Sequence, residues 1–489
     1  MYHRPSRKKQ LARLISLYTV LTLLVLAIVT FISLFVLGFR FDSDKGHLEQ
    51  YAFLQFDSSP SGAKVTVDGA EVGLGTPNKT SVPAGKHEVT MSREGYETWS
   101  KSVDAKAGVI TWLNYTLLVP KILTVEPVAT YESVYLTLAS PKGRSMLIQR
   151  RVDTPTFSLA DLSSDKVKST ELTIPASLYS ESTTLGVTHT FQIAKWDEGG
   201  RYVLIKHTYD AKDEWLVFDT QNVALTKNIT QLFNVTISGI TFSGTSGNMF
   251  YILDSGNIHR LDLSAQTISE PLVSNVTSFG VYESNIITYV GIDATIADKR
   301  VVGLYRDGDD KSYVLRTVTG SKDIPLHIIT TRYFNEDYVV IAEGKKVDVL
   351  GGSYPNTASD DVTSLKIVAS FETAQDINEI MFSSPIGQYI FIQSGAYIAS
   401  YDLEYQTFAS STIEGTGAVP PIKWLDENYV WSDRDGNLTI REFDGSNVHT
   451  INSVLVGQDV LLTRNGRYLY SINKVDTGYQ LQRVRMILS

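Results

Sequence analysis

The chain has 489 residues, of which 43% are hydrophobic, 20% are charged and none is cysteine. This composition is that of a folded protein with several domains, and it excludes a disulfide scaffold, a thiolate metal site and a cysteine nucleophile. The net charge of −9 argues against a general nucleic-acid-binding protein. The charge is also uneven. Residues 1–40 hold six cations and no acid, which leaves 38 cations against 53 acids, or −15, for residues 41–489.

The first predicted element is a membrane helix at residues 14–38, a run of 25 residues without a charge. At about 1.5 Å per residue, such a helix crosses a hydrocarbon core of about 30 Å with some tilt. A buried globular helix rarely stays apolar on every face for this length. A cleaved signal peptide is the closer alternative, but its apolar region is shorter, about 7–15 residues, and ends in a small-residue site. We therefore predict an uncleaved signal anchor.

The basic cluster before this helix predicts the orientation of the chain. Cations concentrate on the cytoplasmic side of a membrane span. This rule places the basic tail, residues 1–13, in the cytoplasm and residues 41–489 outside it. The predicted location is the cell membrane, with a single span, followed by a linker at residues 39–52.

Short alternating strands separated by Gly and Pro turns begin at residue 53. Lys64-Val65-Thr66-Val67 alternates, and Asp68-Gly69 after it is a hairpin turn. Residues 53–119 therefore predict a small antiparallel β-sandwich. His87 lies in an alternating strand, and a single histidine of this kind is more often structural than a metal ligand.

This module resembles the PEGA domain. The matching residues are Ser59-Pro60, Gly62-Ala63, Val65, Val67-Asp68-Gly69, Gly75-Thr76-Pro77, Pro83-Ala84-Gly85, His87, Val89 and Gly95-Tyr96. The tetrapeptide that gives the family its name is Pro83-Ala84-Gly85-Lys86 here. The resemblance implies a sandwich found in bacterial and archaeal surface proteins, with Tyr96 packed at a corner and without enzymatic activity.

Residues 120–489 show an internal repeat. One signature is a small or polar turn before an apolar strand, and it occurs at residues 141–144, 198–201, 383–388 and 464–467. The second is a strand that ends in an apolar-Asp pair, at Asp161, Asp219, Asp262, Asp348, Asp402 and Asp444. Eight units begin near residues 139, 195, 241, 281, 333, 381, 423 and 461. Repeats of about 40–50 residues with four strands are typical of propeller blades.

The last unit is one strand short, and residues 122–131 are available to supply that strand and close the ring. Closure matters because it removes exposed sheet edges. We predict an all-β ectodomain, a small β-sandwich plus a β-propeller of eight blades, behind one N-terminal transmembrane helix. Seven blades is the alternative count, and a stacked array of sandwiches is the rival fold.

The turn and apolar-Asp signatures resemble bacterial TolB-like or WD-like propellers. The combination of tail, anchor, PEGA-like module and propeller resembles bacterial envelope proteins.

Motifs for chemistry are missing from the sequence. It contains no HExxH, GxSxG or GxxxxGK[ST] motif. Asp433-Arg434-Asp435-Gly436-Asn437 and Asp307-Gly308-Asp309-Asp310 suggest either calcium loops or hairpin turns, and the spacing favours turns. We assign no catalytic, cofactor-binding or metal-binding residue and no cofactor. Four tryptophans, Trp196, Trp215, Trp424 and Trp431, are expected to pack between blades rather than to stack on sugars.

The function expected from these features is that of a non-catalytic, membrane-anchored binding or scaffold protein of the cell envelope. Its propeller would be the platform for an envelope protein or a cell-wall glycan, and the PEGA-like module a spacer or a wall contact. The first alternative is an envelope hydrolase or lyase with an active site in the propeller channel, which requires convergent acids there. The second is a signalling receptor, for which a 13-residue tail is too short to carry an output domain.

Overall fold

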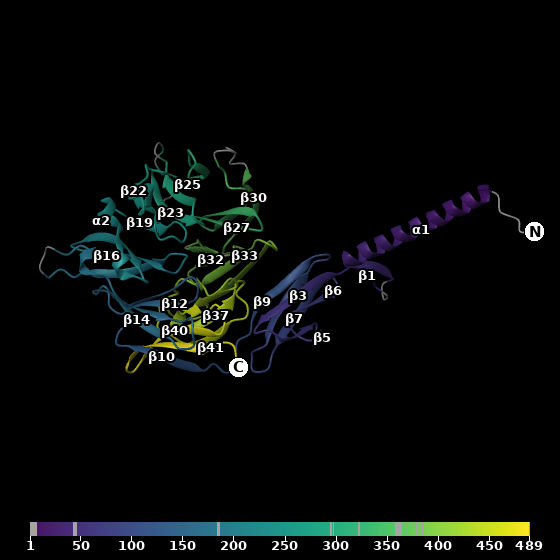
Figure 1. Ribbon diagram of the computed structural model, residues 1–489, viewed down its shortest axis with the longest axis horizontal. Helices are drawn as coiled ribbons and strands as arrows, with labels where there is room; N and C mark the ends of the chain where they lie inside the picture. Colours follow the sequence, from purple (N-terminus) through teal and green to yellow (C-terminus); the bar gives the residue numbers. More distant parts are fainter. Residues whose placement is uncertain are drawn as a thin grey trace, which may run out of the picture. The chain divides into compact units, whose positions relative to one another are not determined.

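The computed structural model describes residues 7–42, 46–182, 186–293, 296, 298–320, 323–356, 364–377, 379–382 and 386–488. It divides the chain into two compact units, which are Met1–Ile122 with Ile487–Ser489, and Leu123–Met486. The helix and the small β module belong to the first unit, and the repeated β region forms the second (Figure 1). Part of the basic tail, residues 1–6, and the turn at 383–385 lie outside the described residues.

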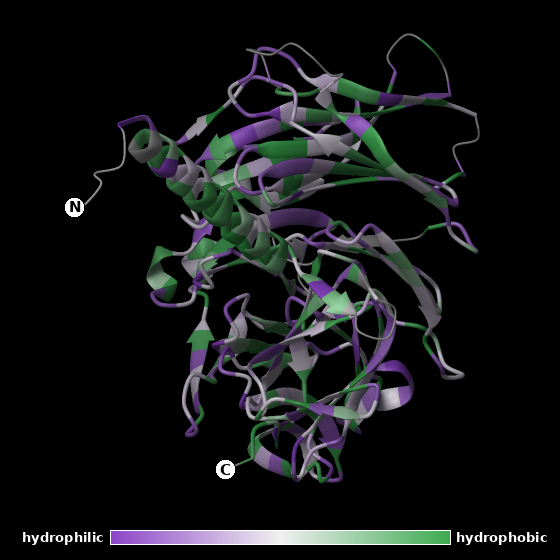
Figure 2. Cartoon of the chain, turned by 90° about the vertical axis from the view of Figure 1, so that its right-hand side faces the viewer, coloured by the Kyte–Doolittle hydropathy of each residue, from purple (hydrophilic) through white to green (hydrophobic). Residues whose placement is uncertain are grey.

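The long helix α1 spans Arg7–Val36. Its segment Leu11–Val36 is long and apolar enough to cross a membrane (Figure 2). None of its most apolar stretch is buried within the protein. By length and composition this helix fits either a membrane anchor or a signal sequence, and both interpretations were considered in the sequence analysis. The helix ends at Val36, and Gly38 two residues later has a φ of +84°, a conformation that glycine adopts without a Cβ clash.

The segment expected to be a linker instead begins with a β-hairpin. Strand β1 (Phe39–Asp42) pairs in antiparallel fashion with β2 (His47–Gln50). The Gln50 side-chain amide donates to the Leu37 carbonyl at 3.0 Å, and the Tyr51 N–H donates to Gly38 at 2.9 Å. These bonds satisfy backbone carbonyls at the end of the helix, which explains why the chain folds directly after it.

The small β module is a sandwich of two sheets with the strand orders β6-β3-β9 and β5-β4-β7-β8. Its strands are β3 (Ala52–Ser59), β4 (Lys64–Val67), β5 (Ala70–Val72), β6 (Asn78–Val82), β7 (Gly85–Ser92), β8 (Trp99–Ala105) and β9 (Ile110–Leu117). Alternate residues of β3, such as Leu54 and Phe56, are fully buried in the core with Trp99. The alternation predicted at residues 64–67 is also seen in β4, where Val65 and Val67 are buried, as expected for a sandwich with one face of each sheet in the core.

One pairing differs from the expected antiparallel arrangement, because β3 and β9 run parallel. These are the first and last strands of the sandwich, and no tight turn joins them, so nothing in the local sequence determines their direction. The predicted hairpin is present at Asp68-Gly69, whose positive φ angles of 50° and 81° join β4 to β5. Tyr96 is 2% exposed at the predicted corner, and its hydroxyl accepts a hydrogen bond from the Leu488 N–H at 2.7 Å.

The second unit consists of consecutive four-stranded antiparallel sheets. Eight such sheets are found among its described strands, which equals the number of units expected from the repeat. The first two sheets contain β11 (Leu136–Ala139), β12 (Ser145–Gln149), β13 (Thr156–Asp161) and β14 (Lys168–Thr173), and then β15 (Thr190–Trp196), β16 (Tyr202–Tyr209), β17 (Lys212–Asp219) and β18 (Lys227–Asn228). The third and fourth sheets contain β19 (Gly239–Phe242), β20 (Met249–Asp254), β21 (Asn257–Asp262) and β22 (Thr267–Ile268), and then β23 (Val276–Tyr282), β24 (Ile286–Ile292), β25 (Lys299–Arg306) and β26 (Tyr313–Thr319).

A short helix, α2 (Ile229–Phe233), follows β18 in the second sheet. The remaining four sheets complete the unit. The strands are β27 (Leu326–Tyr333), β28 (Glu336–Glu343), β29 (Lys346–Gly352) and β30 (Lys366–Glu372); β31 (Glu379–Phe382), β32 (Tyr389–Ser394), β33 (Tyr397–Asp402) and β34 (Thr407–Thr412); β35 (Lys423–Trp424), β36 (Tyr429–Ser432), β37 (Asn437–Glu442) and β38 (His449–Ser453); and β39 (Leu461–Leu462), β40 (Tyr468–Val475) and β41 (Gly478–Arg485) with β10 (Val125–Tyr131).

The pairing of β10 with β41 closes the ring as predicted, because the first strand of the unit completes the sheet formed by its last three. First strands of successive sheets contact one another, as in β11 with β15, β19 with β23, and β27 with β31. They therefore surround the axis of the ring. Sequential four-stranded sheets closed in this way are the architecture of a β-propeller.

Candidate functional site

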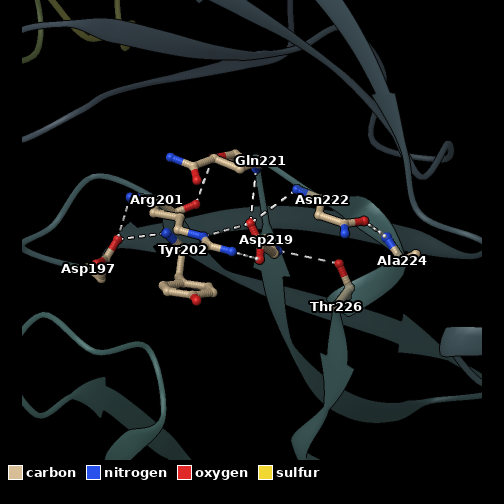
Figure 3. Close-up of polar contacts among 9 residues, drawn as sticks. Asp197, Arg201, Tyr202, Asp219, Gln221, Asn222, Ala224 and Thr226 are labelled. Atoms are coloured by element: carbon tan, nitrogen blue, oxygen red, sulfur yellow. Dashed lines mark hydrogen bonds and ion pairs between the residues drawn. The ribbon is translucent and has the colours of Figure 1, made fainter.

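The apolar-Asp signature has a structural explanation at the ends of the third strands. In the second sheet, Asp219 ends β17 and accepts hydrogen bonds from the N–H groups of Gln221 at 2.9 Å and Asn222 at 3.2 Å (Figure 3). The Arg201 guanidinium donates to the same carboxylate at 3.1 and 2.7 Å. Burial alone raises the pKa of Asp219, but the bonds from Arg201 and the two backbone groups outweigh it and lower the pKa.

The same turn recurs in the other sheets. Carboxylates that end a third strand accept a backbone N–H two residues later in three further cases: Asp161 from Ser163 at 3.0 Å, Asp262 from Ser264 at 2.8 Å and Asp402 from Glu404 at 2.8 Å. Asp444 lies two residues beyond the end of β37 and accepts from the Ser446 N–H at 3.0 Å in the same way. An aspartate in this position favours a turn because its side chain replaces a backbone acceptor. The signature thus marks where the third strand ends.

Asp348 is the exception to that signature, because it lies inside β29 rather than at its end. It is 1% exposed, and its carboxylate accepts hydrogen bonds from Ser370 Oγ at 2.6 Å and from the Arg316 guanidinium. Burial raises the pKa of Asp348, but the bonds from Ser370 and Arg316, together with the nearby Lys346, outweigh burial and lower the pKa. The apolar-Asp pair in the sequence is the same in both cases, so it cannot tell a buried, ion-paired aspartate such as Asp348 from an aspartate at a turn.

The turns before the second strands use a buried acceptor in a similar way. Asp197 is fully buried and accepts from the Gly199 N–H at 3.0 Å. It also accepts from the N–H groups of Arg201 and Tyr202, both at 2.7 Å (Figure 3). Asp426 accepts from Asn428 and Tyr429 at 2.8 and 2.7 Å. Acids at both kinds of turn therefore hold the backbone of the propeller, which explains why they recur at the period of the repeat.

The two possible calcium loops are hairpin turns, as the spacing predicted. Asp435 has a φ of +58°, and its carboxylate accepts from the N–H groups of Thr416 at 2.9 Å and Gly417 at 2.7 Å. Asp307 accepts from Tyr251 Oη at 2.8 Å and from Arg260 Nη1 at 2.7 Å. Hydrogen-bond donors of the protein thus contact the carboxylates of Asp435 and Asp307. Within the part of the chain that the structure describes, no cluster of three or more His, Asp or Glu residues is arranged to hold a metal ion.

His87 is structural, as expected, because both its ring nitrogens are used within the sandwich. Nδ1 lies 2.6 Å from Asp68 Oδ2, and Nε2 lies 2.8 Å from the Pro83 carbonyl oxygen. Burial lowers the pKa of His87, but the bonds to Asp68 and Pro83 together outweigh burial and raise the pKa. A carbonyl oxygen and a carboxylate only accept, so the arrangement favours the imidazolium, which donates from both nitrogens.

A second histidine constellation, which sequence reasoning missed, lies in the second sheet of the propeller. His207 Nδ1 lies 2.8 Å from Glu214 Oε1, and His207 Nε2 lies 2.8 Å from His189 Nδ1. His207 is fully buried and Glu214 is 2% exposed, whereas His189 is only half-buried. We call these three residues the His–His–Glu relay. The relay connects a buried carboxylate to a side chain that reaches the surface.

The contacts of Glu214 determine how the protons of the relay are placed. Burial raises the pKa of Glu214, but bonds from His207 and from Ser180 help lower it to about 2, so the carboxylate is ionised at neutral pH. His207 Nδ1 must then donate to it. In neutral rings His207 Nε2 accepts from His189 Nδ1–H, which leaves the lone pair on His189 Nε2. This nitrogen can therefore act as a base or a hydrogen-bond acceptor.

Strand register brings the relay together. His207 on β16 lies opposite Glu214 on β17, and Phe191 on β15 lies opposite His207. The rings of Phe191 and His207 stack at 4.3 Å, and those of His189 and His207 at 5.1 Å. A hairpin pairing of residues 207 and 214 could have been suggested from the short turn at 210–211. The position of His189 depends on a third strand and a longer connection, so the sequence holds no signal for it.

The tryptophans pack in the propeller core. Trp196 and Trp431 are 4% and 3% exposed, and the Trp196 indole N–H donates to the Leu138 carbonyl of the preceding sheet at 3.1 Å. Trp215 and Trp424 are partly buried and pack against neighbouring apolar clusters. Trp196, Trp215 and Trp424 pack between neighbouring sheets, as the sequence analysis expected, and Trp431 is buried.

Comparisons with known proteins agree with the two-part organisation. Residues 53–119 match the model of the PEGA domain family. A comparison of the sequence with curated proteins found no match. The similar solved structures include an oligogalacturonate lyase in complex with manganese, which is 12% identical, with 61% of this chain and 96% of that one covered and a TM-score of 0.38.

Two other similar structures have comparable scores. A prolyl endopeptidase is 12% identical, with 74% of this chain and 56% of that one covered and a TM-score of 0.45. A chain of a yeast heterotrimeric nucleoporin complex is 9% identical, with 65% of this chain and 98% of that one covered and a TM-score of 0.41. The assignment of a propeller rests on the sheet order and ring closure described above. The chain thus combines a PEGA domain at residues 53–119 with a β-propeller, behind one apolar N-terminal helix.

Proposed function

We propose that this protein is a non-catalytic binding or scaffold protein of the cell envelope, with α1 as its single membrane anchor. In this proposal residues 41–489 lie outside the cytoplasm, the propeller is the platform for an envelope protein or a cell-wall glycan, and the PEGA domain is a spacer or a wall contact. No nucleic acid and no cofactor take part.

The observation that supports the proposal most is that the acidic residues of the propeller stabilise its turns. The recurring aspartates of the propeller accept backbone N–H groups at turns, as at Asp197 and Asp219, so the repeat maintains a rigid ring. A rigid ring that presents many surface loops suits binding. The apolar helix and the basic residues before it support an anchored protein with its ectodomain outside.

Topology is tested with the help of an unusual feature, the absence of cysteine. Single cysteines are introduced at Lys8 in the tail and at Lys86 in the PEGA domain, both of which are exposed. A membrane-impermeant maleimide should label Lys86→Cys in intact cells and Lys8→Cys only after permeabilisation. Loss of the tail from the mature protein would instead identify a cleaved signal peptide, and labelling of Lys8→Cys in intact cells would reverse the orientation.

Wall binding is tested by sedimenting purified residues 41–489 with isolated sacculi, beside residues 120–489. If only the longer protein pellets, the part that contains the PEGA domain is required for wall binding, and the propeller is free for another partner. If neither pellets, wall binding is refuted, and crosslinking in intact membranes then tests for a protein partner.

The His–His–Glu relay is the specific observation that favours the alternative, an envelope hydrolase. A carboxylate that orients one histidine against another is an arrangement used by general bases. Against it, His207 and Glu214 lie on the second and third strands of their sheet, whereas the first strands surround the axis. Release of soluble fragments from wall glycan by the wild type, and its loss in His189→Gln, would support this alternative; no release by the wild type would exclude wall glycan as a substrate.

A further inference from the structure

Ring closure brings together two basic turns that lie more than 300 residues apart in the sequence. The turn at residues 141–144 belongs to the first sheet, and the turn at residues 464–467 belongs to the last. A Cβ placed on Gly143 would lie 2.9 Å from the Leu462 carbonyl oxygen and 3.4 Å from the Arg464 nitrogen. The two turns are therefore in contact, and Lys142, Arg144 and Arg464 become neighbours.

A third turn joins them from the same side of the first sheet. The Leu162 N–H donates to the Arg144 carbonyl at 2.7 Å. Asp165 Oδ2 forms an ion pair with Arg467 at 3.1 Å, and the Asp165 carbonyl accepts from Arg483 Nη1 at 2.8 Å. The exposed Lys166 follows directly in the chain. The basic residues of the first and last sheets thus form one surface.

An aromatic ring lies beneath part of this surface. Tyr468 is 3% exposed, and the guanidinium carbons of Arg467, Arg483 and Arg485 lie 5.2, 4.3 and 5.5 Å from its ring centroid. Arg485 also donates to Tyr468 Oη at 3.1 Å. Cation–π contacts of this kind restrict the side chains, so the three arginines are held in position before a partner arrives.

The charge of this surface is opposite to that of the ectodomain. The segments 141–144, 161–168, 464–467 and 483–485 hold eight cations and two acids, whereas residues 41–489 as a whole carry −15. We call these four segments the closure patch. Lys142, Arg144, Lys166 and Arg464 are exposed and have no ion-pair partner among the residues that the structure describes. Their charge is available to an external partner.

We propose that the closure patch binds a soluble linear polyanion whose repeating groups are phosphate or carboxylate. Guanidinium groups donate two parallel hydrogen bonds to either group, and an unpaired cluster of cations attracts a flexible polyanion from solution. A lipid surface is disfavoured because none of the large apolar side chains found exposed in the described chain lies in these segments. Stable interfacial binding usually adds such side chains to charge.

This inference names a partner class for the proposed platform and rests on that proposal only for placing the patch outside the cytoplasm. The test uses the full-length protein in neutral detergent with fluorescent inorganic polyphosphate, with polygalacturonate as the carboxylate probe and phosphatidylglycerol vesicles as the lipid probe. The patch variant is Lys142→Glu, Arg144→Glu and Arg464→Glu combined. Its matched control is Lys227→Glu, Lys345→Glu and Lys366→Glu, three exposed cations outside the patch that give the same change in net charge.

The expected result is that the wild type and the control bind at least one of the two polymers, that the patch variant binds it at least tenfold more weakly, and that added salt weakens the binding. The single variant Arg464→Glu repeats the test with less risk to folding, and circular dichroism checks that each variant is folded. Equal binding by patch and control variants, or no binding of either polymer by the wild type, overturns the inference. Patch-dependent binding of vesicles alone overturns the choice of a soluble polymer. Failure of the platform proposal itself is recognised separately, from cysteine labelling and sedimentation.

Discussion

Replacing His87 by glutamine tests whether a charged His87 stabilises the PEGA domain through its hydrogen bonds. The ring of His87 is 9% exposed and bridges Asp68 and the Pro83 carbonyl. Glutamine retains a hydrogen-bonding group but carries no charge. Hydrogen bonds to charged groups contribute about 1.5–3 kcal/mol. We expect a loss below this range, about 1 kcal/mol, because the Asp68 side chain is 55% exposed and solvent screens the pair.

The pH dependence of this loss has a defined sign. The pKa of His87 is raised above its ordinary value of 6.5, so its contribution to stability is fully present below pH 6.5 and is lost as the pH rises through the raised pKa. The pKa of Asp68 is lowered from 3.8, so its contribution is present above pH 3.8 and is lost as the pH falls through the lowered value. His87→Gln should therefore destabilise the domain most near pH 5.5 and least near pH 8.5.

The assay is calorimetry of residues 41–489 at these two pH values. One kcal/mol corresponds to a shift of about 4–8 °C in the midpoint of a domain of this size. The transition of the propeller serves as the internal reference, and His259→Gln, whose histidine contacts the Ser269 carbonyl in the propeller, is the control variant. A loss of stability that is the same at pH 5.5 and pH 8.5 would refute the assignment of a charged His87.

The other predictions concern the propeller. Asp219→Asn should lower the stability of the propeller by about 2–3 kcal/mol, since it breaks the ion pair between a buried carboxylate and the partly exposed Arg201. Asp262→Asn, whose carboxylate binds backbone groups, should cost about 1 kcal/mol or less, and chemical denaturation compares the two variants. Gln393→Leu should speed hydrogen exchange at the Ile422 amide, which donates to Gln393 Oε1 at 2.8 Å, and unchanged exchange would contradict this contact between sheets. Deleting residues 123–131 should expose the edge of β41 and cause association, which light scattering detects; a monomer would argue against ring closure.

Much of the architecture follows from local sequence patterns. The alternation of Lys64-Val65-Thr66-Val67 predicted the strand β4, Asp68-Gly69 predicted a hairpin, and the missing strand of the last unit predicted the pairing of β10 with β41. These features depend on a side-chain period of two and on turn residues, which are properties of short segments. Most of the periodic aspartates likewise marked strand ends, because they bind a backbone group two or three residues away, whereas Asp348 lies inside β29 and binds side chains instead.

Only the tertiary structure decided the features that join distant segments. The parallel pairing of β3 with β9, the relay from His189 through His207 to Glu214, and the closure patch all depend on which strands become neighbours. The sequence by itself determined the apolar helix, the strands and their repeat, since these depend on the spacing of residues within short segments. It did not determine the groupings of charge and chemistry, because register and ring closure are set by packing across the whole fold.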